Sequence, residues 1–204
     1  MKHHLSKRII GVDLGDQKHV ISVLERRTKK IIDERSITNH RDSLRRLSKK
    51  HPGALIAMEV GTHSPWISRF LTKLDHEVLV ANPRKVRAIF QNDRKCDLYD
   101  ARMLAKLAAF DPEMLHPIEH QSEQAQRDLL QIKLRDSLVR RRVDLISAVR
   151  GVFKSLGLQL KLSNTHYFAR HTRKALQEHD AQARVLVEPM LETIETMSKQ
   201  IRVL

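Results

Sequence analysis

The order of short apolar runs in the first third of the chain limits its fold more than any other feature. RIIGVD at 8–13, HVISVLER at 19–26 and KIIDERSI at 30–37 are each rich in β-branched residues. A turn-like LGDQK separates the first two runs, and a charged turn separates the second from the third. Short β-rich runs joined by tight turns predict three antiparallel strands that follow one another in a sheet.

The next segments predict helices that alternate with buried strands. Residues 39–50 indicate a helix capped by Asn39, and residues 64–74 indicate a second, amphipathic helix. Between them, ALIAMEV at 54–60 is apolar enough for a strand buried on both faces, and EVLVA at 77–81 is a further strand. A basic stretch then leads into a third helix. The order β-β-β-α-β-α-β-α predicts an α/β, ribonuclease-H-like fold with a mixed sheet of strand order 3-2-1-4-5.

The remainder of the chain has helical periodicity. We expect one long helix over 121–156 and another over 171–204, and hence two domains, 1–112 and 113–204. Two long helices with apolar seams predict a helical hairpin or an intermolecular coiled coil. The seam of the first helix is Leu130, Leu134, Leu138, Leu145, Val149, Val152 and Leu156, and that of the second is Leu186, Met190, Ile194, Met197 and Ile201.

Two acidic residues stand where two predicted strands end. Asp13 closes the first strand, and Glu59 closes the fourth. If these strands are parallel neighbours, they lie about 4.8 Å apart and their carboxylates share one edge of the sheet. A carboxylate in a buried apolar strand costs several kcal/mol unless it is paired or binds a metal, which makes Glu59 the more telling of the two.

A second pair of acids opens the third predicted helix. Asp97 and Asp100 are three residues apart and therefore share one helix face, which continues through Ala101, Leu104 and Ala108. Their place in the first turn favours the ionised form. Four carboxylates brought together would repel one another without a cation, and Mg²⁺ or Mn²⁺ is the hard oxygen-binding ion that suits them.

Each acid also has an ordinary structural interpretation. Asp13 can be a turn residue, Asp97 an N-cap and Asp100 a common first-turn acid. The joint placement of the four, with Glu59, favours a catalytic metal site at Asp13, Glu59, Asp97 and Asp100. Two ions about 4 Å apart in such a site can hold the attacking and leaving oxygens of a phosphodiester.

The charge balance predicts a polyanionic partner. The formal net charge is +14 and the isoelectric point is near 10.3. Cations that neutralise phosphates release condensed counterions, so a surplus of this size favours nucleic acid, although a solvated basic surface is the plain alternative. The candidate nucleic-acid contacts are Arg84, Lys85, Arg87, Arg94, Lys95, Arg140, Arg141, Arg142, Arg150 and Lys154.

Other classes of protein are excluded or disfavoured by what the sequence contains. The single cysteine, Cys96, rules out an internal disulfide and a cysteine-based zinc cage. No apolar run approaches the roughly 20 residues that span a membrane, and the start of the chain is unlike a secretory signal. We therefore expect a cytoplasmic protein without a membrane partner.

Three segments resemble the DEDD-type transposases of bacterial insertion sequences, whose relatives include the pilin-gene invertases. These are IGVDLGDQKHVISV, AMEVGTHSPWISRFL and VANPRKVRAIFQNDRKCDLYDARMLAKLA. The N-terminal domain of that family is similar to the Holliday-junction resolvase RuvC. On this resemblance the family's acidic tetrad falls on Asp13, Glu59, Asp97 and Asp100, and Cys96 replaces a residue that is more usually threonine.

The resemblance implies an enzyme that cuts and rejoins DNA with divalent metal, guided by a structured RNA that the element encodes. From the apolar seams of the helical region we expect a homo-oligomer, a dimer or tetramer. Members of the family continue into a C-terminal domain with a nucleophilic serine, whereas this sequence stops at Leu204. We therefore expect a truncated chain that does not complete recombination alone.

Competing functions remain open from the residues alone. A Holliday-junction resolvase shares the fold and the acids but has no need of the long helical region. A DEDD exonuclease usually begins with Asp-x-Glu, whereas this motif is Asp13-Leu14-Gly15. An actin-like ATPase needs a second glycine-rich phosphate loop, which six glycines do not supply. A non-enzymatic, basic nucleic-acid-binding and dimerising module is the alternative from a different class.

Overall fold

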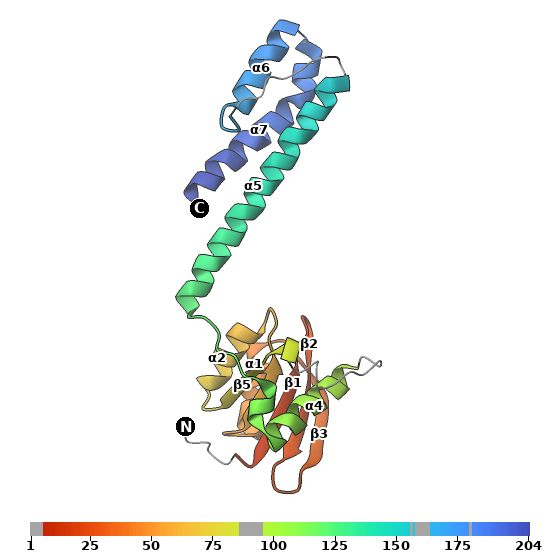
Figure 1. Cartoon of the computed structure of the whole chain (residues 1–204), viewed down its shortest axis with the longest axis vertical. Coiled ribbons are helices and arrows are strands. Elements are labelled where there is room, and N and C mark those ends of the chain that lie inside the picture. The colour runs from red at the N-terminus through yellow and green to blue at the C-terminus, as the bar shows by residue number, and fades with distance from the viewer. Residues whose placement is uncertain (1–5, 86–95, 156, 158–163, 180) are drawn as a thin grey trace. The chain divides into compact units, whose positions relative to one another are not determined.

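The structure is a computed structural model, and it describes residues 6–85, 96–155, 157, 164–179 and 181–204. The chain forms two compact units, Met1–His120 and Gln121–Leu204, and each is described by itself (Figure 1). The helices and strands of both units are labelled in Figure 1.

The first unit is built on a five-stranded sheet with the order β3-β2-β1-β4-β5. β1 pairs antiparallel with β2 and β2 with β3, whereas β1–β4 and β4–β5 are parallel. The predicted strand order and the predicted α/β ribonuclease-H-like class are therefore confirmed. The strands are β1 (Arg8–Asp13), β2 (Lys18–Glu25), β3 (Lys30–Thr38), β4 (Leu55–Glu59) and β5 (Glu77–Ala81).

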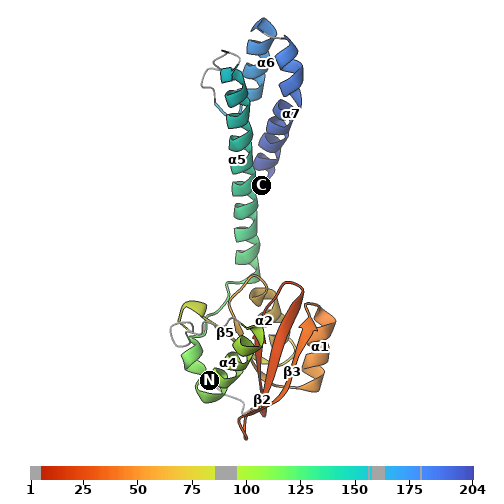
Figure 2. The ribbon, with the colours of Figure 1, turned by 90° about the vertical axis from the view of Figure 1, so that its right-hand side faces the viewer.

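Helices cover both faces of this sheet, so that strand residues alternate between two cores (Figure 2). α1 (Arg41–Lys50) and α2 (Ser64–Thr72) cover one face, where Ile10, Val12, Ile56 and Met58 are buried with them. α4 (Asp97–Phe110) covers the other face, where it buries a second set of strand residues. That second core contains Ile9, Leu24, Leu55, Ala57, Ala81, Leu104, Ala105, Leu107 and Ala108.

The first helix begins later than its sequence predicts. Its N-cap is His40, whose side chain accepts a hydrogen bond from the backbone N–H of Asp42 at 3.3 Å. Asn39, the predicted cap, instead donates its side-chain amide to the backbone carbonyl of Asp16 at 3.0 Å. The prediction of Asn39 as the cap was therefore wrong, because its side chain ties the end of β3 to the β1–β2 loop.

The segment after α4 stays with the sheet. A short 3₁₀ helix, η1 (Pro112–Leu115), is followed by a bridge in which the N–H of Ile118 donates to the carbonyl of Val80 at 2.9 Å. The first unit therefore ends at His120, later than the boundary that the sequence suggests near residue 112.

The second unit contains α5 (Glu123–Ser155), α6 (Phe168–His179) and α7 (Ala181–Val203). α7 packs against both α5 and α6. The predicted single helix over 171–204 was wrong, because α6 folds back to pack its own apolar side on α7. The core of this unit is Ile146, Val149, Phe153, Phe168, Ala169, Leu176, Ala183, Val187, Leu191 and Ile194.

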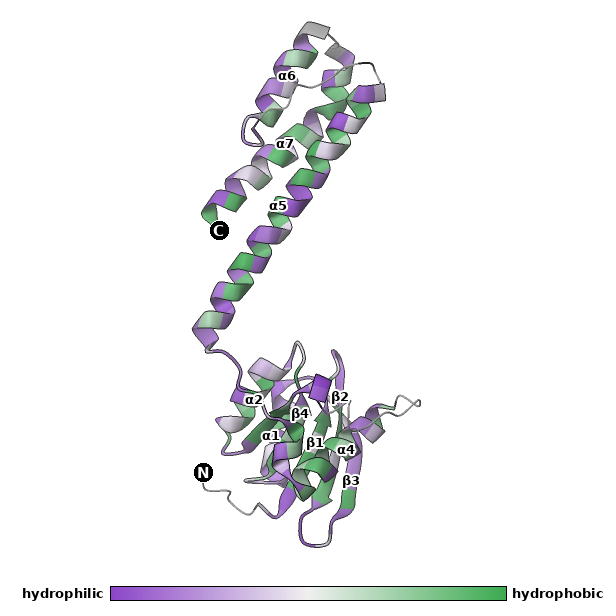
Figure 3. Cartoon of the chain, viewed as in Figure 1, coloured by the Kyte–Doolittle hydropathy of each residue, from purple (hydrophilic) through white to green (hydrophobic). Residues whose placement is uncertain are grey.

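The predicted apolar seams are buried only in part. Val149 and Ile194 are buried as expected, whereas Leu130 is 57% exposed and Leu186 is 81% exposed. In Figure 3, hydrophobic residues gather on the strands of the first unit, and α5 carries apolar and polar residues along its length.

Arg173 locks α6 to α7. Its guanidinium donates to Glu188 Oε1 at 2.7 Å and to Glu195 Oε1 at 2.6 Å. The carboxylates, that of Glu195 foremost, raise the pKa of Arg173.

None of the helices in the described residues is long and apolar enough to cross a membrane.

Candidate functional site

Asp13 and Glu59 end two neighbouring parallel strands. The β1–β4 register aligns Val12 with Met58, so the two acids follow that pair directly. In β1 and β4 the alternate residues Ile9 and Leu55 face α4, so alternation places Asp13 and Glu59 on the α4 face as well. Both acids are half-buried. The structure thus brings these two predicted site residues to one edge and one face of the sheet.

α4 runs so that its first turn starts at the same edge. Gly11 of β1 lies directly against the Ala101–Ala105 backbone of α4. At the far end of the helix, the Phe110 ring lies 5.9 Å from Nζ of Lys29, in the β2–β3 turn at the opposite edge of the sheet. The first turn of α4 therefore lies toward the end of β1 that carries Asp13.

Asp97 and Asp100 occupy that first turn. Asp100 is half-buried and begins the buried face, whereas Asp97 is exposed to solvent, so the spacing places only one of the two acids against the sheet. Cys96 is the N-cap residue and makes no side-chain capping bond, so the helix start relies on other contacts for its position.

An ion pair anchors α4 to the sheet just after its acids. The guanidinium of Arg102 donates hydrogen bonds to both carboxylate oxygens of Glu34 in β3, with Nη2 at 2.5 Å from Oε2. The hydroxyl of Ser22 in β2 donates to the same carboxylate at 3.1 Å. Arg102, and then Ser22, hold the pKa of Glu34 below its usual value. In sequence Glu34 looked like any outward residue of a strand, so no pattern pointed to this anchor.

The donor chemistry at this edge suits a hard divalent cation, since all four side chains are carboxylates. Among the residues described by the structure, no three His, Cys, Asp or Glu side chains stand close enough together to hold a metal ion. The metal-binding role of the four acids stays a prediction.

The loops that follow Asp13 and Glu59 are joined by His63, which precedes α2. Nε2 of His63 lies 3.0 Å from Oδ1 of Asp16. The indole N–H of Trp66 donates to Nδ1 of His63 at 3.3 Å. Because Nδ1 accepts, Nε2 must carry the ring proton and donate it to Asp16. This contact clamps the β1–β2 loop to the β4–α2 loop.

A buried histidine lies beside this clamp. His19 at the start of β2 is fully buried, and its ring centroid is 6.5 Å from that of His63 in an edge-to-face arrangement. Neither ring nitrogen of His19 has a hydrogen-bond partner among the described residues. Burial lowers the pKa of His19, so the ring is held neutral inside the sheet.

Two of the predicted basic contacts lie at the edge of the sheet where β1 ends in Asp13 and β4 ends in Glu59, which we call the acid edge. Arg84 and Lys85 are exposed and follow β5 after two intervening residues, and the last residue of β5, Ala81, pairs with Glu59. The backbone N–H of Arg84 donates to Oδ1 of Asn82 at 3.1 Å, which fixes the start of this segment. The predicted contacts Arg87, Arg94 and Lys95 lie outside the described residues.

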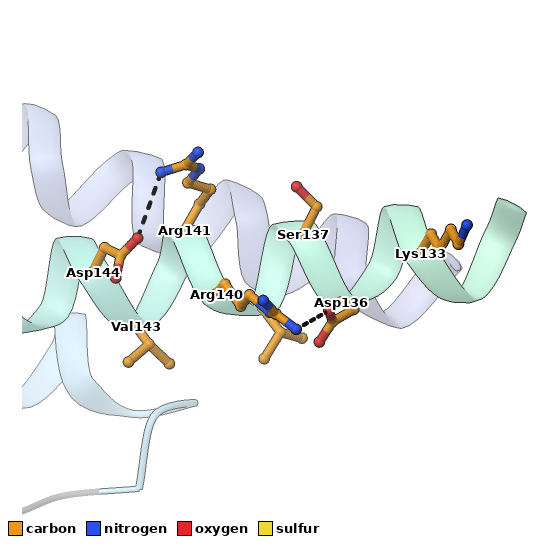
Figure 4. A pocket seen from close by; sticks show the side chains of 8 residues that line it. Lys133, Asp136, Ser137, Arg140, Arg141, Val143 and Asp144 are labelled. Carbon is orange, nitrogen blue, oxygen red and sulfur yellow. Dashed lines mark ion pairs between the residues drawn. The ribbon is translucent and has the colours of Figure 1, made fainter. Parts of the chain in front are cut away.

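The basic residues predicted on α5 divide into two groups. Arg140 and Arg141 are exposed, but each pairs with an acid of its own helix, Asp136 at 2.9 Å and Asp144 at 3.7 Å (Figure 4). These side chains, with Lys133, Ser137, Val139 and Val143, line a shallow hollow on α5.

The other α5 cations contribute partly to packing. Arg142 donates to the hydroxyl of Ser198 in α7 at 3.2 Å, and the Arg150 guanidinium lies 5.2 Å from the Phe168 ring centre. Lys154 is exposed. Arg142 and Arg150 are therefore less available to a nucleic-acid backbone than the sequence suggests.

Comparison with known proteins identifies relatives of this chain. The family model of DEDD transposases of the IS110 type, described as a transposase, matches residues 10–157. A probable family 20 transposase of Pseudomonas aeruginosa is 29% identical over 150 residues, which are 73% of this chain and 42% of that protein. The transposase for insertion sequence element IS1328 of Yersinia enterocolitica is 26% identical over 152 residues, which are 74% of this chain and 44% of that protein.

The alignments therefore span less than half the length of these two relatives. Among solved structures, T. thermophilus RuvC in complex with Holliday junction substrate is similar over 52% of this chain and 95% of that chain, with 12% identity and a TM-score of 0.35. The fold is defined by the strand order and pairing given above.

Proposed function

This chain belongs to the DEDD transposases of the IS110 type, and from that membership we propose that it carries the metal-dependent chemistry of an enzyme that cuts and rejoins DNA. The observation that carries the proposal is the placement of Asp13 and Glu59 at the ends of adjacent parallel strands, on the face covered by α4.

We assign the binding of divalent metal to Asp13, Glu59, Asp97 and Asp100. The first two are fixed by strand pairing, and the second two belong to a helix that Gly11 and the Glu34–Arg102 pair hold against the sheet. When bound, Mg²⁺ or Mn²⁺ would activate the attacking oxygen and stabilise the leaving oxygen of a phosphodiester. The protein's own part is to hold the carboxylates in register and to keep the loops behind them in place.

The proposed partners are DNA and a structured guide RNA. The net charge of +14 supports a polyanionic partner, and Arg84 and Lys85 are cations placed beside the acid edge. We also propose a homo-oligomer, a dimer or tetramer, formed by the helical unit, because α5 exposes several large apolar residues. These are Leu129, Leu130, Ile132, Leu134 and Val143.

Metal-dependent DNA binding tests this function. We expect the wild-type chain to bind a branched DNA more tightly when Mg²⁺ or Mn²⁺ is added. The double variant Asp13→Ala/Glu59→Ala should lose this metal-dependent increment and keep the metal-independent binding. Equal responses to metal in both proteins would remove the carboxylates from the function and favour a non-enzymatic binding module.

A further inference from the structure

The outer side of α1 carries a dense row of cations. The helix reads RDSLRRLSKK, with five basic residues and one acid in ten positions. Arg41, Arg45 and Lys49 are four residues apart, so they share one side of the helix at intervals of about 6 Å along its axis. All three are exposed, whereas Leu44 and Leu47 on the opposite side are buried in the sheet core.

Most of this charge is not neutralised by neighbours. Asp42 pairs with Arg45 at 2.8 Å, and Asp33 of β3 pairs with Lys50 at 2.9 Å. Arg41 and Lys49 make no ion pair with any residue that the structure describes. By contrast, the exposed arginines Arg140 and Arg141 of α5 each have an acid on their own helix. The α1 row therefore keeps a larger local surplus of positive charge.

The two arginines of the row are also preorganised. The guanidinium carbon of Arg41 lies 5.7 Å from the centre of the Phe70 ring, and that of Arg45 lies 5.5 Å from the same centre. Cation–π contact with one aromatic ring of α2 restricts both side chains. Less rotamer entropy is then lost when a phosphate is bound.

The row starts at the acid edge of the sheet. β2 is antiparallel to both β1 and β3, so β3 runs in the same direction as β1. The end of β3 at Thr38 therefore lies at the same edge as Asp13. The backbone N–H of Asn39 donates to the carbonyl of Gln17 at 2.9 Å, which ties the entry to α1 to the loop after Asp13. α1 then leads away from this edge along the face opposite α4.

We propose that Arg41, Arg45 and Lys49 form a phosphate-backbone track for the nucleic acid that meets the acid edge. The choice of nucleic acid rests on the proposed function; the track itself rests on the charge, spacing and stacking of α1. Evenly spaced cations, of which Arg41 and Lys49 have no ion pair among the described residues, with no exposed apolar residue among them, suit a repeating anion better than a protein surface.

The salt dependence of binding measures how many phosphates the track contacts. The full chain is titrated by fluorescence anisotropy into duplex DNA of about 30 base pairs, with duplex RNA and single-stranded DNA of equal length, in KCl from roughly 50 to 200 mM. Arg41→Gln/Arg45→Gln/Lys49→Gln should make the slope of log Kobs against log salt less negative by about 2 to 3. The matched control Arg27→Gln/Lys29→Gln/Lys30→Gln removes equal charge from exposed residues at the opposite edge and should change the slope by less than about 0.5.

Each outcome decides the proposal. A slope change confined to the α1 variant supports the track, and the probe that shows it identifies DNA or RNA as the ligand. Equal changes in both variants would reduce the effect to overall charge, and an unchanged slope in the α1 variant would remove the track; either result overturns the proposal. The α1 variant should retain Mn²⁺ binding. A failure of the proposed metal site, tested by Asp13→Ala/Glu59→Ala, can therefore be told apart from a failure of the track, tested by the salt dependence of the α1 variant.

Discussion

Gly11 is important to the acid edge because it has no side chain. A Cβ at this position would lie 1.9 Å from the carbonyl oxygen of Ala101 and 2.6 Å from the backbone N of Ala105. Both contacts are backbone atoms of α4, so no flexible side chain can give way. The absence of a side chain at Gly11 therefore sets how closely the helix that carries Asp97 and Asp100 approaches the strand that carries Asp13.

Replacing Gly11 should displace α4 and destabilise the first unit. We expect Gly11→Ala to lower the free energy of unfolding by about 1–3 kcal/mol, the usual range for overpacking a core. Gly61→Ala is the matched control, because a Cβ there meets nothing within 4 Å. Denaturant unfolding followed by the fluorescence of Trp66, the chain's single tryptophan, measures both. Equal stabilities would contradict the close approach.

The contact between His63 and Asp16 can be tested with substitutions that do or do not replace the N–H group at Nε2 of His63. Gln places an amide N–H near the position of Nε2 and can still donate to Asp16, whereas the shorter Asn cannot reach it. Since Asp16 is 94% exposed, the pair should be worth less than about 1 kcal/mol. We expect hydrogen exchange of the backbone amides in residues 14–17 to accelerate about threefold to fivefold in His63→Asn, and to change little in His63→Gln. Similar acceleration in both would mean that the contact with Asp16 does not hold the loop.

These residues show what could be predicted from the sequence at this scale. Asp13 and Glu59 could be singled out because a charged residue at the end of an apolar strand breaks a pattern. Gly11, His63 and Glu34 break no pattern, since their importance depends on which backbone or side chain lies opposite. Contacts between distant segments of that kind are invisible until the strands are in register.

At the scale of elements, the strands and helices were the most predictable part. β5 begins and ends where EVLVA predicts, and the strand order follows from the lengths of the connections. The division of the last helix into α6 and α7 was missed because Leu176 and Ala183 lie in a continuous helical periodicity. Only tertiary packing shows that these two residues belong to helices that fold against each other.

Buried histidines make the elements of the first unit sensitive to acid. Burial lowers the pKa of His19, His51 and His76 from the ordinary value of 6.5. In the unfolded chain these rings bind protons that the folded protein excludes, so the free energy of unfolding rises with pH in this range. The stability that depends on the neutral rings is complete above 6.5 and is lost as the pH falls below that value.

We therefore expect the denaturant midpoint of Trp66 fluorescence to fall between pH 7.5 and 5.5. His76→Gln removes one titrating ring, which lies 2.8 Å from the hydroxyl of Ser48, and should flatten this decline. A midpoint independent of pH over this range would show that the buried rings do not titrate on unfolding.

At the scale of the whole molecule, two units with different surfaces serve different parts of the proposed function. The first unit holds the acid edge with its flanking cations. In the second unit, only part of α5 packs into the core with α6 and α7. Leu130 and Leu134 lie one turn apart on α5 and are 57% and 50% exposed. Apolar residues at this spacing on a helix favour association with another helix.

The proposed oligomer should depend on that exposed part of α5. We expect the wild-type chain to sediment as a dimer or larger assembly, and Leu130→Glu/Leu134→Glu to shift it toward the monomer by at least about tenfold in the dissociation constant. Ile32→Glu alters an apolar residue of the first unit that is 46% exposed, and should leave the assembly unchanged. Analytical ultracentrifugation over a range of concentrations gives the constants, and an equal mass for all three proteins would contradict this assignment.

The most direct test of the account is the affinity for Mn²⁺, measured by electron paramagnetic resonance, of the wild-type chain and of Asp13→Asn, Glu59→Gln, Asp97→Asn and Asp100→Asn. These substitutions remove one negative charge each and leave the size of the side chain almost unchanged. If the four carboxylates hold the ion together, every variant should bind Mn²⁺ at least about tenfold more weakly than the wild type. Wild-type affinity in the strand variants or in the helix variants would show that the two pairs of acids do not share a site.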